Sequence, residues 1–438
     1  MLYGSSQNLI LLCYSSRSSF INYAFDILRM ISLSFLGAAR EVGRSAILLE
    51  TDSKFLFDYG IKINRKGQPP SFPLEPVGYV DKVIISHAHL DHIGYLPRIF
   101  DHYNVQVLAT APTHDLAGLL FRDAEKLERT PPYKKTSSAK ALGFIKRLEY
   151  EKPLNFKRNK ITAYDAGHII GAMVTLIEYA HHRIVYTGDM KYEDTLMHRK
   201  AVPVRCDTLI TESTYSNRPH PPRHELEKKL IAIAEQTISK GGVLLLPAFA
   251  VGRAQELVRA LHMFDNVYLD GMAIQACEIA LSHSDFMREP GKYESALGNV
   301  TYIKKPNDRA KILARGGIVI TTAGMLEGGP ALSYIPRLNK NSRIVMTGHC
   351  VDGTNGRKLL ETKTITLDKT EFRVKTPVDY LDLSAHAGRD DLLRYINKCA
   401  PERIFVVHGD DCVNFASELS GMGYDACAPS VGERFEVK

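Results

Sequence analysis

The stretch VIISHAHLDHIGYLP, from residue 83 to residue 97, places four polar side chains directly after a short apolar run. His87, His89, Asp91 and His92 fall within six positions. His87 and His89 alternate in an extended segment and can point the same way, whereas Asp91 and His92 begin the following helix. A lone histidine after a strand is usually a satisfied core residue, but this cluster is stabilised most simply by cations. The stretch therefore predicts two adjacent metal ions, one held through each pair.

Further candidate ligands stand at or near the ends of other apolar runs. His168 lies in DAGHIIGA, Asp189 in YTGD and His408 in VVHGD, and each is beside a glycine. Glycine lets the backbone approach a crowded site closely. Asp58, in FLFDYG, is either a carboxylate that orients a ligand histidine or an ordinary turn residue. The order of these residues after the HxHxDH stretch favours one shared metal centre.

Length and composition restrict the class of protein only loosely. The chain has 438 residues, more than one domain usually has, so we expect two domains or one domain with a large insertion. The 56 basic and 49 acidic residues give a formal charge of +7, which suits a polyanionic substrate without singling one out. Seven scattered cysteines without a CxxC pair give no sign of a thiolate zinc site or a disulfide framework, and favour the cytoplasm. No apolar run approaches the roughly 20 residues that cross a bilayer, so no membrane association is expected.

The order of apolar runs predicts two kinds of sheet. Residues 1–29 lack the basic start and the cleavage site of a signal peptide, so we expect either that Met30 is the true start or that residues 1–29 are a disordered extension. From Met30 onward, short apolar runs bounded by Gly, Asp and Ser predict an α/β sandwich of two sheets. Beyond about residue 216, helical patterns alternate with the continuous apolar runs GGVLLLP, GIVITT and SRIVMT. This alternation predicts a parallel sheet covered on both faces.

The order of HxHxDH, a glycine-preceded histidine, a strand-end aspartate and a late histidine resembles the metallo-β-lactamase superfamily. The resemblance implies an αβ/βα four-layer sandwich with a two-metal centre on its edge, where Asp91 lies beside the attacking water. Imidazole and carboxylate ligands without a thiolate favour two Zn²⁺ per chain, with Mn²⁺ as the alternative at the oxygen-richer position. The implied ligands form two groups and a bridge: His87, His89 and His168; Asp91, His92 and His408; and Asp189 between them.

The segment between Asp189 and His408 resembles a particular branch of that superfamily. It contains the motifs TESTYSN, LLPAFAVGRAQEL, TTAGMLEGGPALSY, GTNGRKLL and LSAHAGRD. In this order they resemble the β-CASP nucleases, and within them the archaeal ribonucleases similar to the cleavage and polyadenylation specificity factor, without KH domains. The resemblance implies that Glu212 positions His386, which donates a proton to the leaving oxygen or binds the scissile phosphate. The alternative is that His386 is a core histidine that caps the following helix.

The same resemblance sets the expected domain boundaries. Residues 30–217 are expected to form the first part of the metallo-β-lactamase domain, and residues 371–438 its last part. Between them, residues 218–370 are expected to form an inserted β-CASP domain with an α/β parallel sheet.

The expected activity is hydrolysis of phosphodiester bonds in single-stranded RNA, as an endonuclease, a 5′-exonuclease or both. A cleft between domains favours unpaired strands, because a site in a cleft does not easily reach a phosphate inside a duplex. A DNA nuclease of the same fold is the nearest alternative, and a non-catalytic scaffold, which would typically lose ligands, is another. The family includes dimers, so a homodimer is the expected assembly to test. The candidate phosphate contacts, each of which can equally be a solvated surface residue, are Arg253, Arg357, Lys358 and Arg389.

Overall fold

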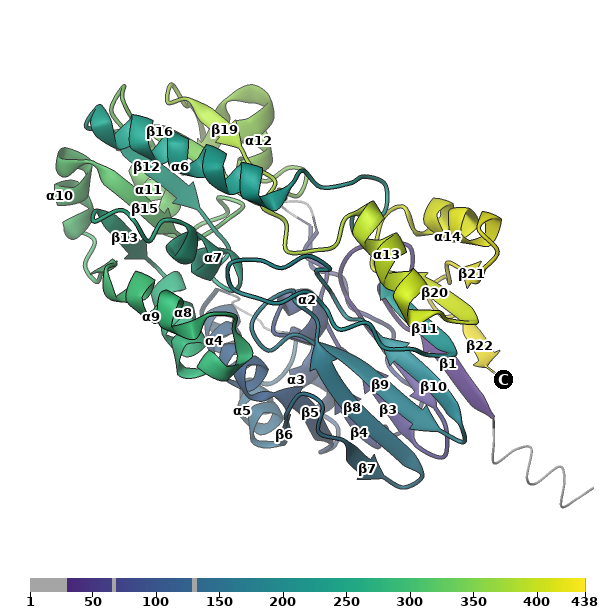
Figure 1. Cartoon of the computed structure of the whole chain (residues 1–438). Coiled ribbons are helices and arrows are strands. Elements are labelled where there is room, and N and C mark those ends of the chain that lie inside the picture. The colour runs from purple at the N-terminus through teal and green to yellow at the C-terminus, as the bar shows by residue number, and fades with distance from the viewer. Residues whose placement is uncertain (1–29, 65–67, 128–131, 438) are drawn as a thin grey trace, which may run out of the picture.

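Two seven-stranded sheets and one six-stranded sheet form the framework of the molecule (Figure 1). The structure is a computed structural model, and it describes residues 30–64, 68–127 and 132–437. The expectation for residues 1–29 lies outside the described residues. Among those that are described, no helix combines the length and the apolar character that crossing a bilayer requires.

The first sheet collects strands from the beginning of the chain and one from its end. Its central strands are short and almost entirely buried, because the sheet is covered on both faces. In spatial order they are β22 (Arg434–Val437), β1 (Ile31–Phe35), β2 (Ile47–Glu50), β3 (Lys54–Phe57), β4 (Lys82–Ile84), β5 (Gln106–Thr110) and β6 (Ile145–Leu148).

The second sheet packs face to face on the first. In spatial order its strands are β21 (Asp425–Cys427), β20 (Arg403–Val407), β11 (Thr208–Glu212), β10 (His182–Tyr186), β9 (Met173–Tyr179), β8 (Asn159–Asp165) and β7 (Leu154–Phe156). Aromatic side chains from both sheets meet in the buried layer between them, and the ring centroids of Phe35 and Phe405 lie 5.1 Å apart. Each fully buried side chain of this size contributes about 1.5–3 kcal/mol to folding.

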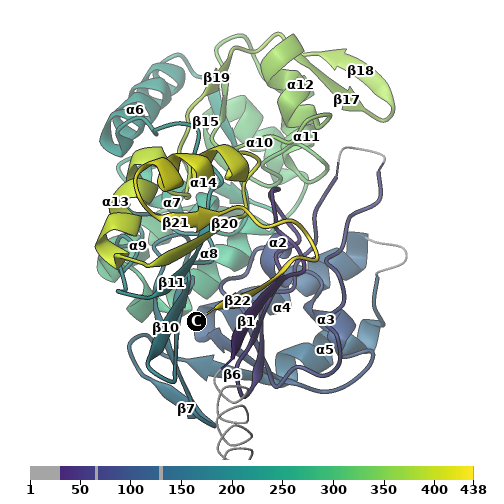
Figure 2. The same cartoon turned by 90° about the vertical axis from the view of Figure 1, so that its right-hand side faces the viewer.

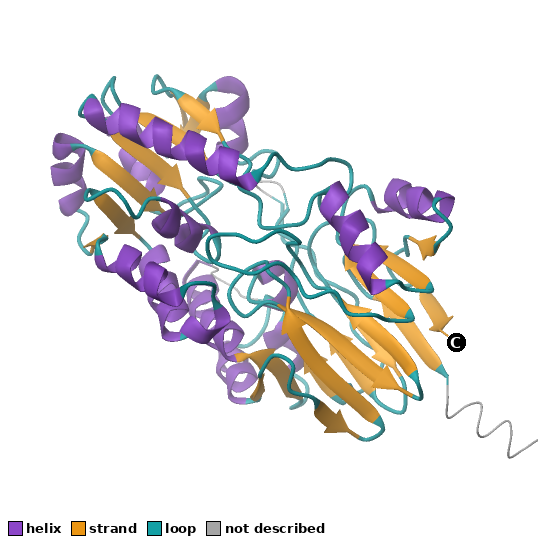
Figure 3. Cartoon of the chain, in the orientation of Figure 1, coloured by secondary structure: helices purple, strands orange, loops and turns teal. Residues whose placement is uncertain are grey.

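Helices cover the outer faces of both sheets and complete the four layers. The first sheet is covered by α2 (Leu90–Ile93), α3 (Leu96–Ile99), α4 (Ala111–Leu127) and α5 (Lys135–Gly143). The second sheet packs against α13 (Arg389–Cys399) and α14 (Cys412–Gly421). Figure 3 shows the strands of the two sheets with helices outside them. The expected αβ/βα sandwich is confirmed.

The third sheet belongs to the inserted segment and is parallel throughout. In spatial order its strands are β14 (Thr301–Ile303), β13 (Val267–Asp270), β15 (Gly317–Thr321), β12 (Val243–Pro247), β16 (Arg343–Met346) and β19 (Val378–Tyr380). Beside it lies a hairpin of β17 (Thr364–Leu367) and β18 (Thr370–Arg373). The other helices of the insertion are α6 (Arg223–Ser239), α7 (Arg253–Ala260), α8 (Ala273–Ser282), α9 (Pro290–Gly298), α10 (Asp308–Arg315), α11 (Ala331–Tyr334) and α12 (Asn355–Thr362), with 3₁₀ turns η1 (Ser284–Phe286) and η2 (Ile335–Arg337).

After the insertion the chain returns to the first two sheets. β20 pairs with β11, and β22 pairs with β1 at the opposite end of the sequence. Figure 2 shows the yellow β22 beside the purple β1. The inserted sheet extends past the expected boundary at residue 370, because β19 pairs with β16 before the chain leaves it. The return to the sandwich therefore begins after residue 380.

Candidate metal centre

The HxHxDH stretch forms the turn that joins β4 to α2. His89 takes an extended conformation directly before the helix, and Asp91 and His92 lie inside it. The backbone after β3 is hydrogen-bonded to this turn, since Tyr59 donates its N–H to the His92 carbonyl oxygen at 2.8 Å. A Cβ atom on Gly60 would lie 1.8 Å from the Asp91 carbonyl oxygen, so only glycine permits this approach. The turn is thus fixed by backbone contacts as well as by its own helix.

Asp58 is a fully buried carboxylate that orients the ring of His92. Its Oδ2 atom lies 2.7 Å from His92 Nδ1 and accepts hydrogen bonds from the Ser86 and Tyr186 hydroxyl groups, each also at 2.7 Å. With Nδ1 engaged in this way, the Nε2 atom of His92 faces the centre. Sequence reasoning nominated Asp58 but missed Ser86 and Tyr186, since nothing in their local pattern distinguishes them from ordinary strand residues.

His168 and Asp189 enter the site from loops of the second sheet. His168 follows Gly167, and Asp189 follows Gly188, both of which have a positive φ that disfavours other residues. A Cβ atom on Gly188 would lie 2.6 Å from the Cβ atom of Ser86, directly beside the HxHxDH turn. Both glycines therefore permit the close approach of backbone that the sequence suggested.

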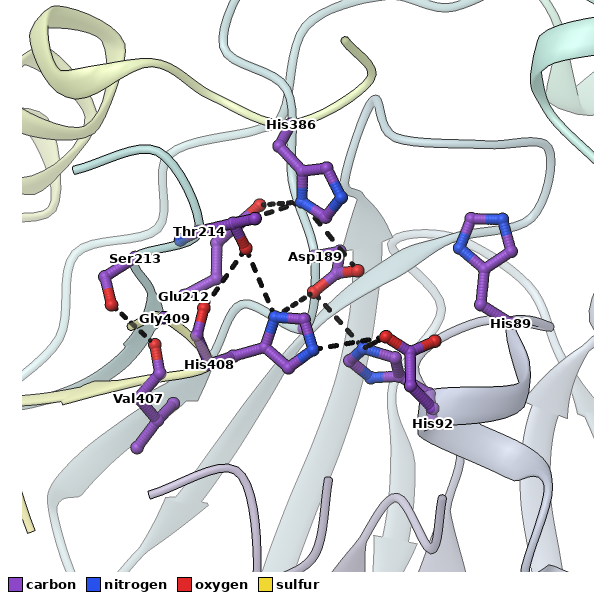
Figure 4. Close-up of polar contacts among 12 residues, drawn as sticks. His89, His92, Asp189, Glu212, Ser213, Thr214, His386, Val407, His408 and Gly409 are labelled. Carbon is purple, nitrogen blue, oxygen red and sulfur yellow. Dashed lines mark hydrogen bonds and ion pairs between the residues drawn. The ribbon is translucent and has the colours of Figure 1, made fainter. Parts of the chain in front are cut away.

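His408 brings the C-terminal part of the chain to the same place. It follows β20, has a φ of 49°, and donates its backbone N–H to the Ala38 carbonyl oxygen at 2.7 Å. Its Nδ1 atom lies 3.2 Å from an Asp189 oxygen, and its Nε2 atom lies 3.3 Å from Asp91 Oδ2 (Figure 4). Thr214, which the sequence reasoning missed, places its hydroxyl group 3.2 Å from His408 Nδ1.

The seven residues nominated from the sequence come together in two groups that share Asp189. Within each group the candidate ligand atoms all lie within 4.8 Å of one another. The first ligand group is His87, His89, His168 and Asp189, and the second ligand group is Asp91, His92, Asp189 and His408.

The donor set fits metal ions better than it fits hydrogen bonding among the ligands. Three buried atoms of the second ligand group, His92 Nε2, Asp189 Oδ1 and His408 Nε2, make no properly directed hydrogen bond, although other atoms of the same group lie 3.2–3.3 Å from them. Leaving buried polar atoms unpaired costs about 1–3 kcal/mol each, so a converging set of them requires an explanation. A cation that all of them bind supplies one, and neutral imidazoles with ionised carboxylates are its usual ligands.

The electrostatics of His87 and Asp189 agree with this fit. Burial, followed by the neighbouring His92, lowers the pKa of His87 well below its ordinary value, so that ring stays neutral. Burial works against ionisation of Asp189, but His408 and His92 outweigh it and hold the pKa of that carboxyl group well below its usual range. The neutral ring and the ionised carboxylate are states that metal binding needs. Burial disfavours the charged ring of His92, but Asp189 and Asp91 outweigh it and raise the pKa of His92 well above its ordinary value, so metal binding there displaces a proton.

Glu212 and His386 form a pair at the rim of the centre (Figure 4). Glu212 ends β11 and is buried, and its Oε2 atom lies 3.0 Å from His386 Nδ1. The same ring nitrogen lies 3.8 Å from Asp189 Oδ2. Burial disfavours the charged ring, but Glu212 and then Asp189 outweigh it and raise the pKa of His386 to about 9. His386 therefore lies beside the ligands with a raised pKa, and it does not cap the following helix, which begins after Gly388 without a side-chain cap.

Comparisons with known proteins agree with this geometry. Residues 47–202 match the model of the metallo-β-lactamase superfamily domain, residues 254–359 that of the β-CASP domain, and residues 371–429 that of the Zn-dependent metallo-hydrolase RNA specificity domain. Over 432 residues the chain is 37% identical to the probable RNase MJ4 of Methanocaldococcus jannaschii, a match that covers 93% of this chain and 100% of that protein. The chain belongs to the β-CASP family of the metallo-β-lactamase superfamily.

Other proteins that are similar to this chain carry different names. RNase aCSPSF2 of Saccharolobus solfataricus is 32% identical, over 94% of this chain and 87% of that protein. The transcription termination factor FttA of Methanocaldococcus jannaschii is also 32% identical, over 89% of this chain and 69% of that protein. A crystal structure of a protein of unknown function from Enterococcus faecalis shares the fold, with a TM-score of 0.64 and 15% identity over 93% of this chain and 100% of that one.

The basic residues nominated for RNA contact in this β-CASP protein are mostly engaged within the protein. Arg357 pairs with Glu361, Arg389 pairs with Glu418, and Lys358 donates to the Thr366 hydroxyl group. Arg253 differs from these three residues. It is only 7% exposed, its Nε and Nη1 atoms have no hydrogen-bond partner, and burial lowers its pKa to about 10. All four remain predictions as RNA contacts.

The sequence reasoning also missed a cluster that extends from His386 along the domain junction. The ring of Tyr215 lies 5.9 Å from that of His386 and 4.8 Å from that of His220. His220 Nδ1 in turn lies 3.3 Å from Asp382, which also pairs with Arg218 at 2.9 Å. Tyr215 lies in the motif TESTYSN, Arg218 and His220 follow it, and Asp382 stands far along the chain, so no local pattern marks these residues as a group.

Proposed function

We infer that this chain is a metal-dependent ribonuclease that hydrolyses phosphodiester bonds in single-stranded RNA. The observation that carries the inference is the pair of ligand groups that share Asp189, with the Glu212–His386 pair at their rim. The RNA specificity domain that matches residues 371–429, and the ribonuclease names of two relatives, support RNA as the substrate.

Two zinc ions per chain are the cofactors that the donor set favours. Each ligand group offers imidazoles and a carboxylate with no thiolate, which suits Zn²⁺, and the second ligand group has the larger share of oxygen donors. Mn²⁺ is the alternative in the second ligand group for that reason. Bound there, such ions supply Lewis acidity to the phosphate oxygens and lower the pKa of an attacking water.

Asp58, Glu212 and His386 have the remaining roles in positioning and proton transfer. Asp58 holds the His92 ring in one orientation through its contact with Nδ1, and the Ser86 and Tyr186 hydroxyl groups hold the carboxylate in turn, which keeps the second ligand group in place. Glu212 keeps His386 protonated and aims it toward the centre. From that position His386 donates a proton to the leaving sugar oxygen or a hydrogen bond to the scissile phosphate.

The domain division follows from the same inference. Residues 30–217 and 371–438 supply the metal centre. Residues 218–370, together with β19, supply the opposite wall of the substrate cleft.

The cysteines of the described residues are unbridged, which supports a reducing compartment such as the cytoplasm. A homodimer remains a prediction that sedimentation of the purified protein tests.

A comparison of matched oligonucleotides tests the substrate. Metal-loaded protein is mixed with a labelled single-stranded RNA and with the DNA of the same sequence, at one salt concentration, since salt strongly affects such binding. Each is supplied with a 5′-phosphate or a 5′-hydroxyl group, and the product lengths separate endonuclease from 5′-exonuclease action. We expect RNA to be cleaved faster than DNA. Faster cleavage of DNA would favour the nuclease of the same fold that acts on DNA, and cleavage of neither would favour the scaffold.

A further inference from the structure

A single aromatic side chain is exposed in a segment where everything else is buried. Within residues 242–261 every residue is buried except Phe249, which is 38% exposed. The buried residues include Arg253 and Glu256, which are 7% and 6% exposed. This distribution reverses the usual one, in which the charged side chains face water and the phenyl ring is covered. Folding alone does not favour such an arrangement.

Phe249 stands at the centre of the carboxyl edge of the inserted sheet. It follows β12, whose neighbours are β15 and β16, and each of those strands is followed by a glycine. A Cβ atom on Gly324 would lie 3.2 Å from Phe249 Cδ2, and one on Gly348 would lie 3.2 Å from its Cε2. These two positions carry no side chain, so the ring lies close to the backbone of both neighbouring loops. A side chain at either position would press on the ring, which would have to shift by a few tenths of an ångström.

The loop that carries Phe249 packs against the metal centre. A Cβ atom on Gly252 would lie 2.6 Å from Ile169 Cγ2, and Ile169 follows the ligand His168. In Figure 1 the arrowheads of β12 and β13 point toward the half of the molecule that contains this centre. A second exposed aromatic residue, Tyr380, ends β19 at the same edge and is also 38% exposed.

We propose that Phe249 is a stacking platform for one unpaired nucleobase of the RNA, adjacent to the bond that is cleaved. The inference rests on the proposed function, and it names Phe249 as a positioning residue that acts on the substrate away from the reacting atoms. Every base presents a π-face, so stacking on a phenyl ring suits single strands of any sequence. A base inside a duplex has both faces covered by its neighbours and would not fit this platform.

Substitution of the ring tests the proposal. Phe249→Ala should raise the KM for a single-stranded RNA by about 5- to 100-fold, with a smaller change in kcat, because stacking is lost while the ligands remain. Phe249→Trp should restore most of the binding. The control is Met263→Ala, since Met263 is 51% exposed in the same domain but lies in the turn between α7 and β13, at the amino end of that strand and so at the opposite edge of the sheet. The control should match wild type in KM.

An abasic scan makes the test independent of protein folding. Wild-type protein is given RNAs in which each nucleotide in turn lacks its base. We expect one position near the cleaved bond to weaken binding strongly in wild type but little in Phe249→Ala. If no single abasic position weakens binding to wild type, or if Phe249→Ala matches Met263→Ala in KM, the platform is refuted while the ribonuclease activity stands. If metal-loaded wild type cleaves no RNA, the proposed function itself fails.

Discussion

At the scale of single residues, the structure separates ligands from the groups that act beside them. His386→Ala should leave both ions bound and lower single-turnover cleavage by about 10²–10⁴-fold, because a proton donor or preorganised hydrogen bond is lost. Asp91→Ala, by contrast, removes a ligand and should lower both metal content and cleavage. Metal content, melting temperature and cleavage are measured on the same preparations. A stable His386→Ala protein that is replete with metal and cleaves at nearly the wild-type rate would contradict the role of His386.

Asp58 offers a second test at the same scale. Asp58→Asn removes the negative charge that contacts the His92 ring and the Ser86 and Tyr186 hydroxyl groups. Metal binding at the second ligand group should weaken by about 10- to 100-fold, as the loss of such supporting contacts typically causes. Tyr186→Phe removes only one of those contacts and should have a smaller effect. Competition with a chelator measures both affinities. Equal metal affinity in Asp58→Asn and wild type would show that this carboxylate does not support the ligand.

The candidate ligands were predictable from the sequence because strand-end histidines and aspartates form a compact, ordered pattern. Their supports were not predictable in the same way. Ser86 and Tyr186 meet Asp58 only because separate strands place them there. Phe249 also escaped prediction, since a loop after a strand has no fixed period that tells which apolar residue faces outward. Arg253 carried a charge that suggested exposure, yet the packing of α7 buries it.

At the scale of elements, the metal centre depends on how closely backbones approach each other. Gly60→Ala would place a methyl group 1.8 Å from the Asp91 carbonyl oxygen, so the turn between β4 and α2 must shift. We expect a loss of metal content and a lower melting temperature. Gly143→Ala is the matched control, because a Cβ atom at that end of α5 meets nothing within 4 Å. Retention of both ions by Gly60→Ala would mean that the turn tolerates displacement.

The elements themselves were largely predictable, and the boundary of the insertion was less so. Continuous apolar runs correctly predicted the parallel strands, since both faces of that sheet are covered. The strand β19 lies beyond residue 370, where the insertion was expected to end. Its side chains are half-buried or exposed, as in a linker, and only its pairing with β16 shows that it belongs to the inserted sheet. Pairing between distant segments is not encoded in local periodicity.

At the scale of the whole molecule, the two domains share one buried core. A single cluster contains Leu176 of β9, Leu392 of α13, Leu244 of β12 and Leu257 of α7. We therefore expect one cooperative transition in calorimetry, and a rise in melting temperature when Zn²⁺ is added, because ligands that bind only the native state stabilise it. Two separate transitions, of which only one responds to Zn²⁺, would show that the domains unfold independently.

Dependence of cleavage on the two ligand groups is the central claim, and it is tested by returning metal to the stripped protein. The chelator-treated chain is titrated with Zn²⁺ while single-turnover cleavage of a labelled single-stranded RNA is measured, with Asp91→Ala as the control. We predict no cleavage without metal, a rise that saturates at about two equivalents per chain, as expected for a two-metal site, and no comparable rise in the control. Cleavage by the stripped chain, or an inactive chain that holds two equivalents, would contradict the claim.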